Sequence, residues 1–176
     1  LYAREFGVPL YYVDMTYYSW VPHWERPWED AEGVEVEQHR IDVMVEELEG
    51  LIRFLETLTG RQFSETKLRE IMEKSRQQSL YYQRATDLAA TVPCPISWSD
   101  ALSNISGSLY FRGTDWGIEH ARHYYEEIKE RVDKGEGACK NERVRLNYWG
   151  HPVWFSLGVY NAFEEKYGAV FPYSGY

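Results

Sequence analysis

The chain of 176 residues is short of cysteine: it has only two, Cys94 and Cys139, and they lie far apart. Two distant cysteines do not form a disulfide framework, so we expect a fold that is held together by an apolar core. No run of about 18 apolar residues occurs, and we therefore expect no transmembrane helix and no membrane partner. No signal peptide is visible, and a cytoplasmic location is the default expectation.

Basic residues are also in the minority, because 19 Lys and Arg stand against 28 Asp and Glu, a net charge of −9. Nucleic-acid binding requires a basic surface, so we do not expect a nucleic acid as partner. The sequence lacks a phosphate-binding P-loop, a Cys-x-x-Cys pair, a His-Glu-x-x-His zinc motif and a Gly-x-Ser-x-Gly elbow. Short catalytic motifs therefore do not identify its chemistry.

Aromatic residues are abundant, at 16% of the chain, with 15 Tyr and 7 Trp. Five of them stand in a loop between Tyr17 and Trp28, directly after the apolar stretch Val8 to Met15. That stretch is typical of a strand buried on both faces of a parallel sheet. A loop after such a strand is a common ligand site in α/β proteins, although packing of the rings on their own domain is the simpler interpretation.

The middle of the chain is predicted to be helical. Apolar residues recur at steps of three and four, which predicts helices over residues 37–59, 64–92, 99–109 and 114–134. Gly60 and Gly135 follow the first and last of these, where a left-handed residue often ends a helix. Ser99 and Thr114 are the expected caps of the third and fourth helices.

The last part of the chain changes period. Arg143 to Tyr148 alternates polar and apolar residues, an apolar helical face follows from Trp154 to Tyr167, and "AVFPY" ends the pattern as a second strand. Strand, helix and strand in this order predict a parallel βαβ unit. We therefore expect an α/β protein in three parts: the end of a first α/β domain with the aromatic loop (1–33), a helical segment (34–135) and the start of a second α/β domain (136–176). The sequence begins within a helical pattern and stops just after a strand pattern. We therefore expect it to be an internal segment of a longer protein.

Four side chains could carry chemistry, but each has a simpler interpretation. Cys94 lies between two prolines and is interpreted as a small buried filler. Cys139 lies near Lys134 and Lys140, which would favour a thiolate, yet an inert turn cysteine is the simpler interpretation. His120 and His123 could share a metal on one helical face, but they lie opposite the apolar stripe and are expected to face solvent.

Several stretches together resemble one protein family. They are "AREFGVPLYYVDMTY", "IRFLETLTGRQFSETKLREIM", "FRGT", "RVDKGEG", "ERVRLNYWGHPVW" and "FEEKYGAVFPYSGY". The chain is similar over nearly its whole length to the iron–sulfur subunits of 2-hydroxyacyl-CoA dehydratases and ATP-dependent benzoyl-CoA reductase. "FRGT" and "RVDKGEG" look like the reductase branch in particular.

This resemblance implies flavodoxin-like (Rossmann-like) parallel-sheet domains and an oxygen-sensitive enzyme that acts on acyl-CoA thioesters. The family's subunits pair with a second homologous iron–sulfur subunit, and an ATP-hydrolysing activator supplies single electrons that reduce the thioester to a ketyl radical. Three cysteines hold a 4Fe-4S cluster. Cys94 and Cys139 match none of those ligand positions, so we expect the cluster ligands outside residues 1–176.

The resemblance implies that this segment forms part of the wall of the acyl-CoA site. The candidate substrate-binding residues are Arg112 and Trp116 in "FRGTDW", and Tyr173 and Ser174 at the end of the last strand. Arg112 could pair with a CoA phosphate or merely cap a helix. Two alternatives stay open: a non-catalytic scaffold subunit of the same fold, or a related cluster protein that reduces other small molecules.

Overall fold

The computed structural model describes residues 2–14 and 38–175, which belong to two compact units, residues 1–64 and 65–176. The first unit contains α1 (Tyr2–Phe6) and α2 (Gln38–Thr59). The second contains α3 (Glu65–Leu88), α4 (Trp98–Tyr110), α5 (Asp115–Lys134), β1 (Val144–Trp149), η2 (Trp154–Ser156), α6 (Gly158–Tyr167) and β2 (Ala169–Gly175). The aromatic loop between Tyr17 and Trp28 lies outside the described residues.

The strand expected from Val8 to Met15 is wrong for residues 8–14, which have no regular secondary structure and are largely exposed. A strand requires a neighbour that completes its backbone hydrogen bonds, and these residues contact helix α2 instead. The Tyr11 hydroxyl donates to the carbonyl oxygen of Glu47 at 3.2 Å, and its ring lies 5.5 Å from that of Phe54. The apolar pattern is therefore a poor guide to strand structure here.

The helices predicted in the middle of the chain are confirmed, with small changes at their ends. Gly60 and Gly135 have φ values of 67° and 69°, the left-handed conformation expected after a helix. Thr114 caps α5 by accepting a hydrogen bond from the backbone of Gly117. The cap of α4 is Ser97 rather than the expected Ser99, because Ser97 has the extended backbone that lets its hydroxyl accept from Asp100 N.

The parallel βαβ unit predicted at the end of the chain is confirmed. β1 and β2 pair in parallel, with Val144 opposite Ala169 and Asn147 opposite Tyr173, and α6 connects them. Gly168 ends α6 in the left-handed conformation, and its backbone N–H bonds back to α6. The described residues are thus mostly helical with a small parallel sheet, which is an α/β arrangement.

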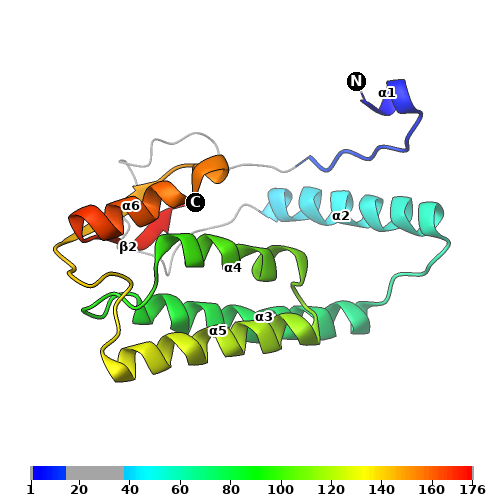
Figure 1. The fold of residues 1–176 in the computed structure, drawn as a ribbon. Helices are drawn as coiled ribbons and strands as arrows, with labels where there is room; N and C mark the ends of the chain where they lie inside the picture. The colour runs from blue at the N-terminus through cyan, green and yellow to red at the C-terminus, as the bar shows by residue number, and fades with distance from the viewer. Residues whose placement is uncertain (1, 15–37, 176) are drawn as a thin grey trace. The chain divides into compact units, whose positions relative to one another are not determined.

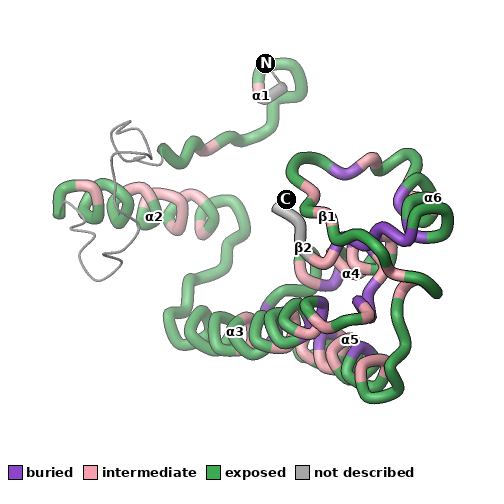
Figure 2. The backbone as a smooth tube through the Cα atoms, turned by 90° about the vertical axis from the view of Figure 1, so that its left-hand side faces the viewer, coloured by how far each residue is buried: buried purple, intermediate pink, exposed green. Residues whose placement is uncertain are grey.

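Strand β2 is the centre of the second unit. Its successive residues Val170 and Phe171 enter two different core clusters, because side chains alternate between the faces of a strand. Val170 packs with residues of α3 and α5, and Phe171 packs with residues of α4 and α6. Figure 1 shows α3 and α5 side by side, with α4 running in the opposite direction, and Figure 2 places the buried residues of this unit among these elements.

Candidate functional site

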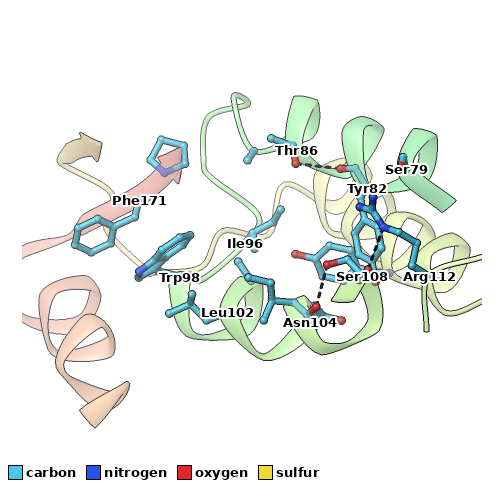
Figure 3. Close-up of a pocket in the computed structure, with 15 residues that line it drawn as sticks. Ser79, Tyr82, Thr86, Ile96, Trp98, Leu102, Asn104, Ser108, Arg112 and Phe171 are labelled. Carbon is cyan, nitrogen blue, oxygen red and sulfur yellow. Dashed lines mark hydrogen bonds between the residues drawn. The ribbon is translucent and has the colours of Figure 1, made fainter. Parts of the chain in front are cut away.

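A cavity of about 410 Å³ lies in the second unit between α3, α4 and β2 (Figure 3). Its volume is within the range of about 300–1,000 Å³ that is typical of small-molecule sites. It is lined by Ser79, Tyr82, Thr86, Ala89, Ile96, Trp98, Ala101, Leu102, Asn104, Ile105, Ser108, Arg112, Tyr124, Phe171 and Pro172. Among the described residues of this lining, Arg112 is the only charged side chain, so the cavity has one defined electrostatic feature.

The two ends of the cavity differ in chemistry. In Figure 3, Phe171, Trp98 and Leu102 lie at one end, and Tyr82, Ser108 and Arg112 lie at the other. The first end is apolar and buried, since Trp98, Leu102 and Phe171 are 6%, 3% and 9% exposed. The second end presents hydroxyl groups and a guanidinium group. A ligand that fits both ends must itself be apolar at one end and polar at the other.

The Arg112 side chain is held at the polar end by a hydrogen bond to the backbone of α4. Its Nε donates to the carbonyl oxygen of Ser108, one turn back on α4, at 3.4 Å. Among the described residues no carboxylate forms an ion pair with Arg112, whereas most arginines of this unit have one. Its remaining guanidinium N–H groups are therefore available to an anionic or carbonyl ligand.

Tyr82 is held at the polar end by His120 of α5. The Tyr82 hydroxyl and His120 Nδ1 are 3.1 Å apart, and the imidazole stacks on the Trp116 ring at 4.9 Å between centroids. Burial raises the pKa of the Tyr82 phenol, so the phenol stays protonated at neutral pH. His120 was expected to face solvent but is half-buried against Tyr82 and Trp116, whereas His123 is exposed as expected and lies 3.2 Å from a Glu119 carboxylate oxygen.

Gly107 of α4 makes the contact between Tyr82 and His120 possible. A Cβ at this position would lie 2.6 Å from the Tyr82 hydroxyl oxygen and 2.7 Å from His120 Nδ1. Glycine weakens the interior of a helix by roughly 0.5–1 kcal/mol relative to alanine. In the sequence pattern Gly107 is only a weak point of the helix, whereas in the structure it marks a close approach of two side chains.

Gln78 ties together the three elements around this end of the cavity. It is 2% exposed, and its Nε2 donates to the carbonyl oxygen of Gly107 at 2.8 Å. Its Oε1 accepts from the backbone N–H of Gly113 at 3.3 Å. Both halves of the amide are thus used, and α3 holds the end of α4 and the Phe111–Thr114 turn that carries Arg112. Sequence reasoning missed Gln78, although a glutamine on an inward helical face is a usable signal.

The four predicted substrate-binding residues fall in different places. Arg112 lines the cavity, and Pro172, the neighbour of Tyr173, lines it as well. Trp116 is 52% exposed and does not line the cavity, but it contacts His120. The backbone of Tyr173 and Ser174 belongs to β2, while their side chains lie outside the described residues. Sequence reasoning missed Tyr82, Trp98 and Phe171, which are ordinary members of apolar patterns.

The apolar end is anchored by a buried carboxylate. Glu164 of α6 is 5% exposed and accepts from the backbone N–H of Trp98 at 3.0 Å, at the first turn of α4. Burial raises the pKa of Glu164, and the hydrogen bond from Trp98 partly opposes this change. The indole Nε1 of Trp98 is buried and finds no acceptor among the described residues.

The two cysteines sit where a packed thiol is expected. Cys94 is fully buried, its Sγ donates to the carbonyl oxygen of Ile96 at 3.4 Å, and burial raises its pKa. Cys139 is half-buried and packs against the same core cluster. In the described part of the chain, no three His, Cys, Asp or Glu side chains are grouped so that they could hold a metal ion. A cluster ligand must be a thiolate, so the surroundings of Cys94 do not fit one.

The comparisons with known proteins give the family of this chain. The family described as "2-hydroxyglutaryl-CoA dehydratase, D-component" matches residues 1–174, and the chain belongs to this family. No helix of the described residues has both the length and the apolar character needed to cross a membrane.

The individual relatives share only about a quarter of their aligned residues with this chain. The chain is 25% identical over 179 residues to the (R)-2-hydroxyisocaproyl-CoA dehydratase alpha subunit of Clostridioides difficile, a match that covers 98% of this chain and 41% of the relative. It is 24% identical over 153 residues to the (R)-phenyllactyl-CoA dehydratase alpha subunit of Clostridium sporogenes, with 86% and 34% covered. The chain therefore spans less than half the length of these relatives.

Proposed function

We propose that this chain is part of a subunit of a 2-hydroxyacyl-CoA dehydratase, and that its cavity forms part of the acyl-CoA site. The family match over residues 1–174 carries the choice of enzyme class, since the relatives named above are dehydratase alpha subunits. In such a reaction a 2-hydroxyacyl-CoA loses water and becomes a 2-enoyl-CoA. The whole protein would work with a second homologous subunit and an ATP-hydrolysing electron donor, by one-electron chemistry through a ketyl radical, in flavodoxin-like domains.

The cavity supports a binding role for this segment. A thioester has a carbonyl oxygen that accepts hydrogen bonds, and CoA carries phosphates. Arg112 offers guanidinium N–H groups to either, and it is the one charged side chain that the structure describes in the cavity lining. We infer that Arg112 contacts substrate, and that Trp116 acts through His120. Tyr173 and Ser174 continue β2 beyond Pro172, and we place them next to the same ligand.

We propose that the 4Fe-4S cluster of the whole protein is held by cysteines outside residues 1–176. When bound, the cluster supplies single electrons to the substrate. The surroundings of Cys94 do not fit a ligand, and Cys139 matches no ligand position of the family, so we infer that this segment contributes binding and not electron transfer. Changing Cys94 and Cys139 separately to serine should leave the cluster absorbance of the full-length protein unchanged, and loss of that signal in either variant would contradict this assignment.

The test uses the full-length protein with its partner subunit, under anaerobic conditions. We expect Arg112→Ala to weaken acyl-CoA binding by about tenfold or more, because a charged hydrogen bond contributes roughly 1.5–3 kcal/mol. Binding is measured by calorimetry, and turnover by the formation of 2-enoyl-CoA after addition of the activator. Tyr173→Phe in the same assays tests the end of β2.

Arg84→Ala is the matched control. Arg84 lies on α3 with its guanidinium 5.8 Å from the centre of the Tyr81 ring, and it does not line the cavity. Equal effects of the two arginine changes would remove Arg112 from the site. Binding of acyl-CoA without turnover would favour the non-catalytic scaffold subunit. Reduction of benzoyl-CoA, or of a small molecule that is not a thioester, would instead favour the reductase branch or a related cluster protein.

A further inference from the structure

We propose that the cavity selects 2-hydroxyacyl groups with an apolar branched or aromatic side chain over those with a second carboxylate. The side chain would lie against Trp98 and Phe171, and the thioester oxygen would accept a hydrogen bond from the Tyr82 phenol beside Arg112. This inference rests on the proposed function and names the substrate class of the same site. It is carried by the two ends of the cavity and by the Tyr82–His120 contact (Figure 3).

Among the described residues the apolar end has no cation that could compensate a carboxylate, and its unpaired donor, the Trp98 Nε1–H, is neutral. Trp98, Leu102 and Phe171 are nearly fully buried, and the described part of the lining has no charged group besides Arg112 at the other end. A carboxylate placed there would lose its water without gaining a cation, which is strongly unfavourable. An isobutyl or benzyl group loses only apolar surface to water, which is favourable. The end therefore discriminates by charge as well as by shape.

The ring arrangement at this end suits a flat or branched group. Trp98 and Phe171 each contact Tyr160 edge to face, with the Trp98 and Tyr160 centroids 6.1 Å apart at 88°. Phe171 and Tyr160 are 5.7 Å apart at 85°. Such edge-to-face pairs fix the orientation of each ring. The wall that a ligand meets is consequently defined by packing, and does not depend on the ligand to order it.

The polar end supplies a positioned donor. With a proton on His120 Nδ1, the imidazole donates to the Tyr82 oxygen, and the phenolic hydrogen is free to point into the cavity. Gly107 leaves room for this contact, and the stacked Trp116 ring holds the imidazole. Tyr82 is thus the group that we place on substrate, and His120 is a positioning residue.

The first test measures wild-type full-length protein with its partner subunit. Dissociation constants are determined by calorimetry for two 2-hydroxyacyl-CoA ligands, one with an isobutyl and one with a carboxyethyl side chain, and for CoA alone. We expect the isobutyl ligand to bind at least about tenfold more tightly than the carboxyethyl ligand. Equal binding of the two, or tighter binding of the carboxyethyl ligand, would overturn the inference. If neither acyl-CoA binds more tightly than CoA alone, the result counts against the proposed function itself.

The second test separates the two ends by mutation. Tyr82→Phe should weaken both ligands by about threefold to tenfold and leave their ratio unchanged, because it removes one neutral hydrogen bond. Trp98→Phe should instead reduce the preference for the isobutyl ligand over the carboxyethyl ligand. Tyr81→Phe is the control, since Tyr81 contacts Tyr125 and does not line the cavity. Equal losses from Tyr81→Phe and Tyr82→Phe would overturn the role of Tyr82.

The role of His120 has a test that a merely structural contact would not pass. An asparagine amide can donate as Nδ1–H does, so His120→Asn should restore part of the affinity that His120→Ala loses. If alanine and asparagine weaken binding equally, or if neither changes it, His120 does not position Tyr82. Denaturant midpoints measured alongside show whether each variant is folded. If a variant does not fold, the ratio of the two dissociation constants of the wild-type protein still decides the inference.

Discussion

Helices α2 and α3 are nearly equal in length, with 22 and 24 residues, but they differ in what they bury. The apolar stripe of α2 is the clearer one in sequence, yet α2 has no buried residue, and Leu48 and Leu55 are 50% and 44% exposed. α3 has a weaker pattern, but it buries Gln78 and Ala85 and packs along α5. An apolar period therefore predicts that a helix forms, whereas the energy it contributes depends on the partner surface.

The largest effect should come from a core residue that faces α3. Ile128 of α5 is 2% exposed, and Ile128→Ala should lower the free energy of unfolding by about 2–5 kcal/mol through lost contacts and a cavity. The matched change in α2, Leu48→Ala, should alter it by no more than about 0.5 kcal/mol. Urea denaturation of the full-length protein, followed by circular dichroism, gives both values. If Leu48→Ala lowers the free energy of unfolding by a comparable amount, α2 is covered in the full-length protein. The difference between α2 and α3 would then not hold.

A pair of glycines sharpens the comparison. Gly107 in α4 and Gly50 in α2 each leave space for a tyrosine hydroxyl, because a Cβ at either position would overlap the hydroxyl oxygen of Tyr82 or Tyr11, respectively. The Tyr82 hydroxyl of α3 is held between α4 and α5, so Gly107→Ala should destabilise by about 1–3 kcal/mol despite the better helix propensity of alanine. Tyr11 lies in a segment that is largely exposed and can turn away, so Gly50→Ala should be neutral or stabilising by up to about 1 kcal/mol.

Thermal unfolding of the two alanine variants beside wild type distinguishes these cases. A neutral Gly107→Ala would show that the Tyr82–His120 contact is loosely held, and this would weaken the positioning role that we assign to His120. Destabilisation by Gly50→Ala of the same size as at Gly107 would show that Tyr11 is fixed on α2.

Most of the helices and the βαβ unit could be predicted from the sequence, because each has a local signal. Gly135 and Gly168 end helices by a property of their own backbone, and Thr114 caps α5 with its own side chain. The stretch from Val8 to Asp14 could not be predicted, because strand structure depends on a neighbour. An apolar run alone does not contain that information.

The candidate site was predictable only in part. Arg112 was a candidate because the Phe-Arg-Gly-Thr stretch belongs to the family resemblance, and it does line the cavity. Tyr82, Trp98 and Phe171 could not, because each one also fits an apolar helix or strand pattern. They become a site only when α3, α4 and β2 meet, which is a property of the tertiary structure.

The smallest expected effect concerns two glutamates that accept hydrogen bonds from backbone N–H groups. Glu164 accepts from Trp98 at 3.0 Å in the buried core, and Glu47 accepts from Asp14 at 3.4 Å near the surface. Because burial raises the pKa of Glu164 in the folded state, the folded state binds its proton more tightly than the unfolded state. The stability that this provides is present below the unfolded pKa of about 4.3 and is lost as the pH rises through the folded pKa.

Glu164→Gln should therefore gain stability over wild type as the pH rises from about 4 to 7, since glutamine keeps an acceptor for Trp98 but never ionises. Melting temperatures of the two proteins across this range measure the difference, with Glu47→Gln as the control near the surface. A difference that stays constant with pH would show that Glu164 is charged at little cost. If Glu47→Gln shows the same pH dependence, burial is not the cause of the pH dependence at Glu164. The contrast between the two units would then not extend to their carboxylates.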